Sequence, residues 1–177
     1  MKRVTIKKAA KFFSWRYFRM AQKAMISTRV FGDERLEPRR LMVSFGVYFT
    51  YMFIQNMLDV WNDVTGAELL GQIETFAKKD VQDLLREFKL PKLSEQEIQT
   101  IFDYQFENLH KIHSEENPML DLMLVFECGL ADYDTEREVI AGIITENEEE
   151  LYNIMMPVAQ DTIDAVQLFD LKDGTRV

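Results

Sequence analysis

The chain has 177 residues, enough for one domain with a substantial hydrophobic core. Hydrophobic residues make up 47% of it and aromatic residues 12%, which excludes a disordered chain. Seven glycines and four prolines are few for a protein of strands and turns, so helices are favoured. A single cysteine, Cys128, excludes an internal disulfide bond and multi-cysteine zinc sites, and it favours a reducing compartment, which we expect to be the cytoplasm.

Charge is divided unevenly along the chain. Residues 1–40 carry twelve Lys and Arg against three Asp and Glu, a net charge of +9, whereas residues 41–177 carry −18. This division predicts a basic arm that meets a polyanion or an acidic surface, or that docks on acidic helices of its own chain or of a neighbouring copy. We expect one all-α domain over residues 1–177, with a basic N-terminal helix and connection (1–40) and an acidic helical body (41–177).

The first helix is predicted over residues 5–26. Apolar residues recur there every three or four positions and form one stripe: Ile6, Ala10, Phe13, Tyr17, Met20 and Ala24. Basic and aromatic residues lie off this stripe, and we expect them to contact a partner: Lys7, Lys8, Lys11, Trp15, Arg16, Phe18 and Arg19. Such a surface fits another protein, an anionic membrane surface or single-stranded nucleic acid. Because charges interrupt this segment before an apolar run forms, it does not resemble a signal peptide.

An uncharged run of eighteen residues, Leu41 to Leu58, follows the connection at residues 27–40. As a helix it spans about 27 Å, at the short end of what a bilayer core requires. Tyr48 and Tyr51 lie near its midpoint, whereas membrane spans place tyrosines at their two ends. We therefore expect a central apolar helix at roughly 41–63 in a bundle of six to eight helices. The alternative is a membrane-associated subunit with residues 41–58 embedded in the bilayer.

Two adjacent helices are predicted after the central run. Thr65 and Gly66 are expected to end the central helix, and an amphipathic helix is expected from residue 67 to residue 90, where Pro91 stops it. Ser94 and Glu97 then have the spacing of a capping box, which marks the start of the next helix.

The last part of the chain carries further helix signals. Asn117 and Pro118 are typical of a helix start, and Thr135 with Glu138 has the spacing of a second capping box. Pro157 is expected to kink or end its helix. A last helix of about ten residues is then expected to carry Ile163, Val166 and Leu168 or Phe169.

Candidate chemistry is sparse. Glu107 and His110 share a helix face, and together with Asp103 they could converge on one metal ion. A ferritin-like di-iron site needs two E-x-x-H units, and the chain has only two histidines, His110 and His113, in one segment. We therefore expect no cofactor and no enzymatic activity, with a weak metal-dependent enzyme at Glu107 and His110 as an alternative.

Acidic residues dominate the end of the chain. Residues 132–170 hold eleven carboxylates and one basic residue, and four of them are candidate contacts with a basic surface: Glu146, Glu148, Glu149 and Glu150. Two further carboxylates, Asp59 and Asp63, are expected to cap the central helix or to pair with Arg16 or Arg19. The sequence predicts a non-enzymatic adaptor, inhibitor or assembly subunit that binds another protein or its own copies. Nucleic acid and a membrane surface are alternative partners of the basic segment, and DNA mimicry is a special case for the acidic face.

Overall fold

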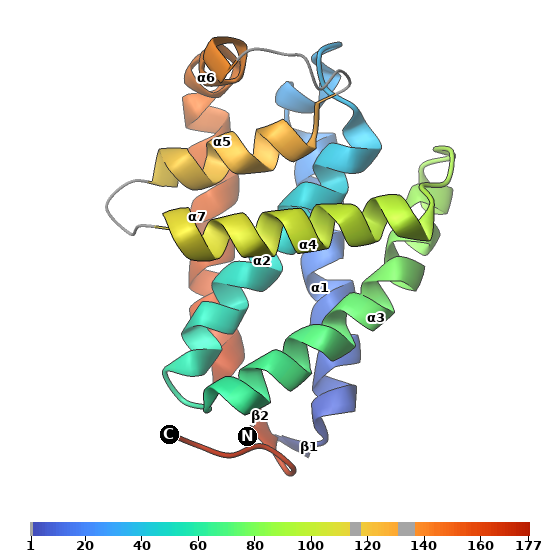
Figure 1. The fold of residues 1–177 in the computed structure, drawn as a ribbon. Coiled ribbons are helices and arrows are strands. Elements are labelled where there is room, and N and C mark those ends of the chain that lie inside the picture. The colour runs from blue at the N-terminus through green and yellow to red at the C-terminus, as the bar shows by residue number, and fades with distance from the viewer. Residues whose placement is uncertain (1, 114–117, 131–136) are drawn as a thin grey trace.

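The computed structural model describes residues 2–113, 118–130 and 137–177 (Figure 1). These residues form an all-α bundle, which confirms the predicted fold class. The helices are α1 (Ile6–Ser27), a 3-10 turn η1 (Val30–Gly32), α2 (Pro38–Leu58), α3 (Asp63–Glu87), α4 (Glu95–Ile112), α5 (Pro118–Cys128), α6 (Arg137–Glu146) and α7 (Glu148–Val166). Two short strands, β1 (Lys2–Val4) and β2 (Phe169–Leu171), pair in parallel and bring the two ends of the chain together.

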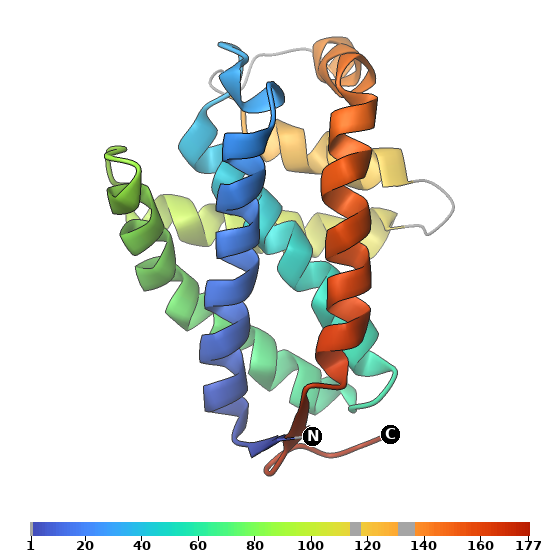
Figure 2. The ribbon, with the colours of Figure 1, turned by 180° about the vertical axis from the view of Figure 1, so that it is seen from behind.

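Helix α2 is the centre of the bundle. Helices α1 and α7 lie on one side of it, and α3, α4 and α5 lie on the other (Figures 1 and 2). Every residue from Leu41 to Tyr51 is buried. Among the described residues, α2 is also the one helix long and apolar enough to cross a membrane, and 78% of its apolar window is buried inside the bundle. The chain's own helices therefore hide this run from water, as predicted for a core helix.

Helix α1 buries more than its predicted stripe. Phe13 packs on Phe53 of α2 with ring centroids 4.0 Å apart, as the stripe predicts. Phe18 is also fully buried, with its ring against Phe102 of α4 and over Gly46, where a Cβ atom would come within 2.4 Å of the ring. The prediction that Phe18 faces a partner is wrong, because α1 packs against more than one helix and the Phe18 ring lies between α2 and α4.

The boundary between α2 and α3 lies earlier than predicted. Helix α2 ends at Leu58, and the side chain of Asn62 accepts a hydrogen bond from the Thr65 amide at 3.0 Å and caps α3. Thr65 and Gly66 are therefore buried in the first turn of α3 and do not break a helix. An N-cap four residues after Leu58 outweighs the turn preference of a Thr-Gly pair.

The capping box before α4 is confirmed. Ser94 accepts a hydrogen bond from the Glu97 amide at 3.1 Å, and the Glu97 carboxylate accepts one from the Ser94 amide at 2.8 Å. Helix α5 begins at Pro118 as predicted, whereas the predicted caps at Asn117 and Thr135 lie outside the described residues.

Pro157 lies inside α7 and does not end it. The helix continues to Val166, and the expected final helix around 163–169 is replaced by the end of α7 and strand β2. Proline removes one amide donor, which leaves the carbonyl of Asn153 without its helical partner. Both Asn153 and Pro157 are exposed, so water can satisfy that carbonyl and the helix tolerates the proline.

Candidate binding groove between α2, α5 and α7

A groove of about 520 Å³ lies between α2, α5 and α7, within the size range of small-molecule sites. Its walls are mostly apolar, and they include four of the chain's ten methionines. The apolar residues that line it are Met52, Met119, Leu122, Ile144, Leu151, Tyr152, Met155, Met156, Ala159 and Ile163. Three of these are half or more exposed, namely Tyr152 at 61%, Met156 at 50% and Ile163 at 50%.

The groove exists because α7 carries two apolar stripes and the bundle covers one. Leu151, Val158 and Ala165 repeat at helical spacing and are buried. Tyr152, Met156 and Ile163 form a second stripe at the same spacing, shifted around the helix, and they remain exposed. Exposed apolar patches of this kind are typical of binding sites.

A few polar groups lie among the apolar walls. The Asn56 amide donates a hydrogen bond to the Thr162 hydroxyl at 3.0 Å, which joins α2 to α7. Glu148 lines the groove at the start of α7 and is exposed. The lining contains two carboxylates, those of Asp121 and Glu148, and the described part of it contains no Lys or Arg.

Asp121 is the most deeply buried charged residue of the groove, with 1% of its side chain exposed. Its Oδ2 atom accepts a hydrogen bond from the Tyr48 hydroxyl at 3.1 Å and lies 2.6 Å from Nδ1 of His113. Its Oδ1 atom has no hydrogen-bond partner among the described residues. One buried carboxylate thus ties α2 and α5 to the end of α4.

Two tyrosines of α2 lie near this carboxylate and stay protonated at neutral pH. Burial and then the negative charge of Asp121 raise the pKa of Tyr48, and the same two causes raise the pKa of Tyr51 to about 12. The Tyr51 ring lies edge-on to the His113 ring, with centroids 5.4 Å apart, and its hydroxyl donates to the Leu109 carbonyl at 3.4 Å. Both hydroxyls therefore act as donors.

Asp121 was not predicted as a site residue, and His113 was not placed beside it. Asp121 belongs to α5 and His113 is the C-cap residue of α4, so only the fold brings them together with Tyr48. One signal was available, because Asp121 is the only charged residue between Pro118 and Phe126. A charge in so apolar a helix requires a partner or a function.

The predicted basic surface on α1 is partly used inside the chain. Arg16 forms a bidentate ion pair with Asp161 of α7, and Arg19 forms an ion pair with Glu87 of α3. Arg16 and Arg19 therefore pair with these two residues and not with Asp59 or Asp63, so the predicted pairing is wrong. The alternative expectation of capping holds for Asp59, which is the C-cap residue of α2. Both Asp59 and Asp63 are exposed at the turn between α2 and α3.

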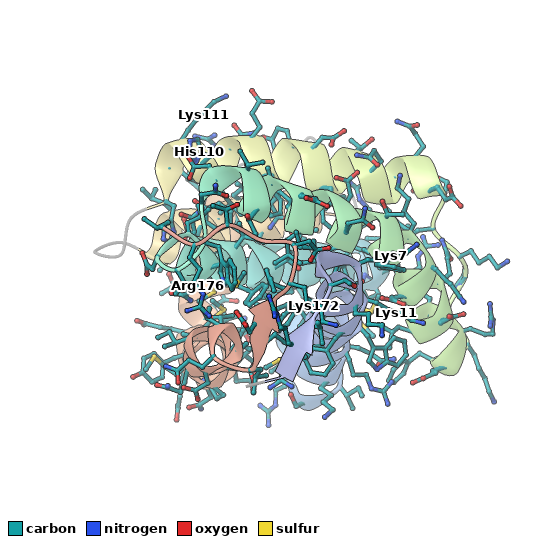
Figure 3. All side chains as sticks on the ribbon, turned by 90° about the horizontal axis from the view of Figure 1, so that it is seen from below. Lys7, Lys11, His110, Lys111, Lys172 and Arg176 are labelled. Carbon is teal, nitrogen blue, oxygen red and sulfur yellow. The ribbon has the colours of Figure 1, made fainter. Side chains whose placement is uncertain are left out.

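Four predicted contact residues of α1 remain on the surface: Lys7, Lys8, Lys11 and Trp15. Trp15 is 40% exposed, as is the neighbouring Phe12. Figure 3 labels Lys7 and Lys11 on α1. Lys8 and Lys172 border the same hollow, beside Phe12 and Phe169. Among the described residues, Lys7, Lys8 and Lys11 form no ion pair within 4.0 Å.

The predicted acidic contacts lie around the junction of α6 and α7, and two of them contact the connection between α1 and α2. The Glu150 carboxylate accepts a hydrogen bond from the Arg29 amide at 2.9 Å, and Glu146 lies 4.0 Å from Arg35. Glu149 is exposed, and Glu148 alone of the four lines the groove. The basic connection therefore docks on acidic residues of its own chain.

The metal-site alternative gains no further ligands from the fold. Glu107 is exposed and accepts a hydrogen bond from Lys111 at 2.7 Å, and His110 lies on the outer side of α4 (Figure 3). Asp103 instead accepts a hydrogen bond from Gln99. Within the described ranges, no three His, Cys, Asp or Glu side chains are grouped closely enough to hold a metal ion.

Comparisons with known proteins give no family for this chain. A scan of protein-family models finds no match. Searches of curated proteins and of solved structures also find no match. The groove and its charges are therefore the basis for a proposal of function.

Proposed function

We propose that this protein is a non-enzymatic adaptor that binds a basic amphipathic helix of a partner protein in the groove between α2, α5 and α7. The observation that carries this proposal is the uncovered second apolar stripe of α7, which lies over a methionine-rich groove. Helix-in-groove binding requires such a surface.

The dimensions of the groove fit a helix. Its α7 wall extends from Glu148 to Ile163, fifteen residues further along the helix, or about 22 Å. A partner helix of three to four turns can place apolar side chains along that wall at positions i, i+4 and i+7. Methionine side chains are unbranched and flexible, so they adapt to the shape of the side chains that they receive.

The charge of the groove favours a basic partner. Asp121 and Glu148 line it, and the body of the chain from residue 41 onward carries a net charge of −18. Such a field attracts a basic segment and repels an acidic one. The alternative of a bilayer-embedded subunit would require α2 to leave the five helices that enclose it.

The test uses two labelled helical peptides of about eighteen residues, or five turns, one of leucine and lysine and one of leucine and glutamate. Fluorescence anisotropy should show binding of the lysine peptide and at least about tenfold weaker binding of the glutamate peptide, because like charges repel. Absence of binding to either peptide, or equal binding to both, contradicts the proposal.

Two pairs of variants locate the binding site. Met156→Glu places a charge on the exposed apolar stripe and should abolish binding of the lysine peptide, whereas Val64→Glu, at a 74% exposed position on α3, should not. Glu148→Lys should weaken binding, and the adjacent Glu149→Lys, outside the groove lining, should do so less. Equal effects within each pair would mean that the peptide binds elsewhere.

A further inference from the structure

We propose that Asp121 is the anchor of the groove and binds one alkylammonium or guanidinium group, the end of a lysine or arginine side chain. This inference rests on the proposed function, since it names the part of the partner that the groove recognises.

Oδ2 of Asp121 is fully engaged and Oδ1 is not. The Tyr48 hydroxyl and His113 Nδ1 both lie within hydrogen-bond distance of Oδ2, at 3.1 Å and 2.6 Å. Oδ1 is buried without a partner among the described residues. A carboxylate can accept about four hydrogen bonds, so half of its capacity is open. A buried acceptor in this state favours any ligand that brings a donor.

The surroundings keep Asp121 ready for a cation. Asp121 lies in the first turn of α5, where the helix dipole favours a negative charge. Among the described residues, no lysine or arginine pairs with Asp121, and none lines the groove. Tyr48 and His113 fix the position of the carboxylate from α2 and from the end of α4, so its geometry is set before a ligand arrives.

The apolar walls suit the stem of a long cationic side chain. A lysine side chain has four methylene groups, which pack on apolar surface while the charged end reaches a polar group. Met52 and Met119 line the same groove as Asp121. Their flexible side chains can turn aside as the ammonium group reaches Oδ1.

The test uses hexylammonium as a mimic of the lysine side chain and 1-hexanol as its neutral counterpart. NMR titrations follow the methionine methyl groups, the Asn56 side-chain amide and the Asp121 carboxyl carbon. The full-length protein should bind hexylammonium about tenfold more tightly than hexanol, since hydrogen bonds to charged groups are the stronger kind. Equal affinities, or a carboxyl signal that hexylammonium does not move, would overturn the anchor.

Asp121→Asn separates anchoring from a purely structural role. The variant should lose about tenfold in affinity for hexylammonium and keep its affinity for hexanol, whereas the control Glu149→Gln, at an exposed carboxylate outside the groove lining, should keep its preference for the amine. If Asp121→Asn weakens both ligands equally, Asp121 only holds Tyr48 and His113 in place.

The two proposals fail in different ways. If the protein binds hexylammonium but not the leucine–lysine peptide, the role of Asp121 is supported and the binding of a partner helix is contradicted. If Asp121→Asn leaves peptide binding unchanged, the binding of a partner helix is supported and the role of Asp121 is contradicted.

Discussion

Helices α1 and α7 lie on the same side of α2, and both carry more apolar surface than one stripe (Figure 2). In α1, both Phe13 and Phe18 are buried, because α1 packs against two helices at once. In α7, Leu151 and Val158 are buried, while Met156 on the second stripe stays exposed. The difference shows that an apolar face is buried in the core or left exposed according to how many neighbouring helices the fold places against it.

Helix α1 and the groove also differ in how completely their charged groups are paired. Arg16 and Arg19 of α1 find carboxylate partners on α7 and α3. In the groove, Asp121 has only Tyr48 and His113 as described partners. The basic segment is thus partly matched by the body of the chain, whereas Oδ1 of Asp121 is buried without a partner among the described residues.

Replacing buried and exposed apolar residues should give the largest contrast between the two regions. Phe18→Ala should lower the free energy of unfolding by about 3–5 kcal/mol, because it removes a fully buried ring and leaves a cavity. Met156→Ala in the groove should change it by less than about 0.5 kcal/mol. Urea denaturation measures both, with Phe12→Ala as a control at a 40% exposed position on α1. Equal losses for Phe18→Ala and Met156→Ala would contradict the comparison.

The ion pair between α1 and α7 should have a smaller effect. Arg16 and Asp161 are 34% and 17% exposed and make two hydrogen bonds, so a double-mutant cycle of Arg16→Met and Asp161→Asn should give a coupling of about 0.5–1 kcal/mol. The coupling should decrease in high salt, because solvent reaches both groups. A coupling of zero at low salt would mean that the pair does not hold the basic segment to the body.

Asp80 should give the smallest effect, visible as a pH dependence. Burial raises its pKa, although the Ser14 hydroxyl donates a hydrogen bond to it at 2.5 Å and opposes that shift. Between the ordinary Asp pKa of about 4 and the raised value, the folded state therefore binds more protons than the unfolded chain. The free energy of unfolding contributed by Asp80 is thus highest at low pH and decreases as pH rises through that window.

The measurement for Asp80 is a difference between two curves. Several other carboxyl groups have lowered pKa values, among them Asp33 and Glu97, and they give the opposite slope. Stability should be measured from pH 3 to pH 7 for the natural protein and for Asp80→Asn, and the variant should gain relative to the natural protein as pH rises. Parallel curves would mean that burial does not shift the Asp80 pKa.

The all-α fold, the central helix and the start of α4 could be predicted from the sequence. The capping box of Ser94 and Glu97 needs only four consecutive residues, and the run from Leu41 to Leu58 has to be hidden whatever surrounds it. The errors at Phe18 and Pro157 have a common cause. Whether a face of a helix is covered depends on residues far away in the chain, and local periodicity does not contain that information.

The sequence by itself determined the secondary structure class, the division of charge and the need to hide residues 41–58 from water, because each depends on composition or on neighbouring residues. The tertiary structure alone decided that Arg16 meets Asp161, that Asp121 meets Tyr48 and His113, and that the second stripe of α7 stays uncovered. These contacts join different helices, and their geometry is set by how the helices pack around α2.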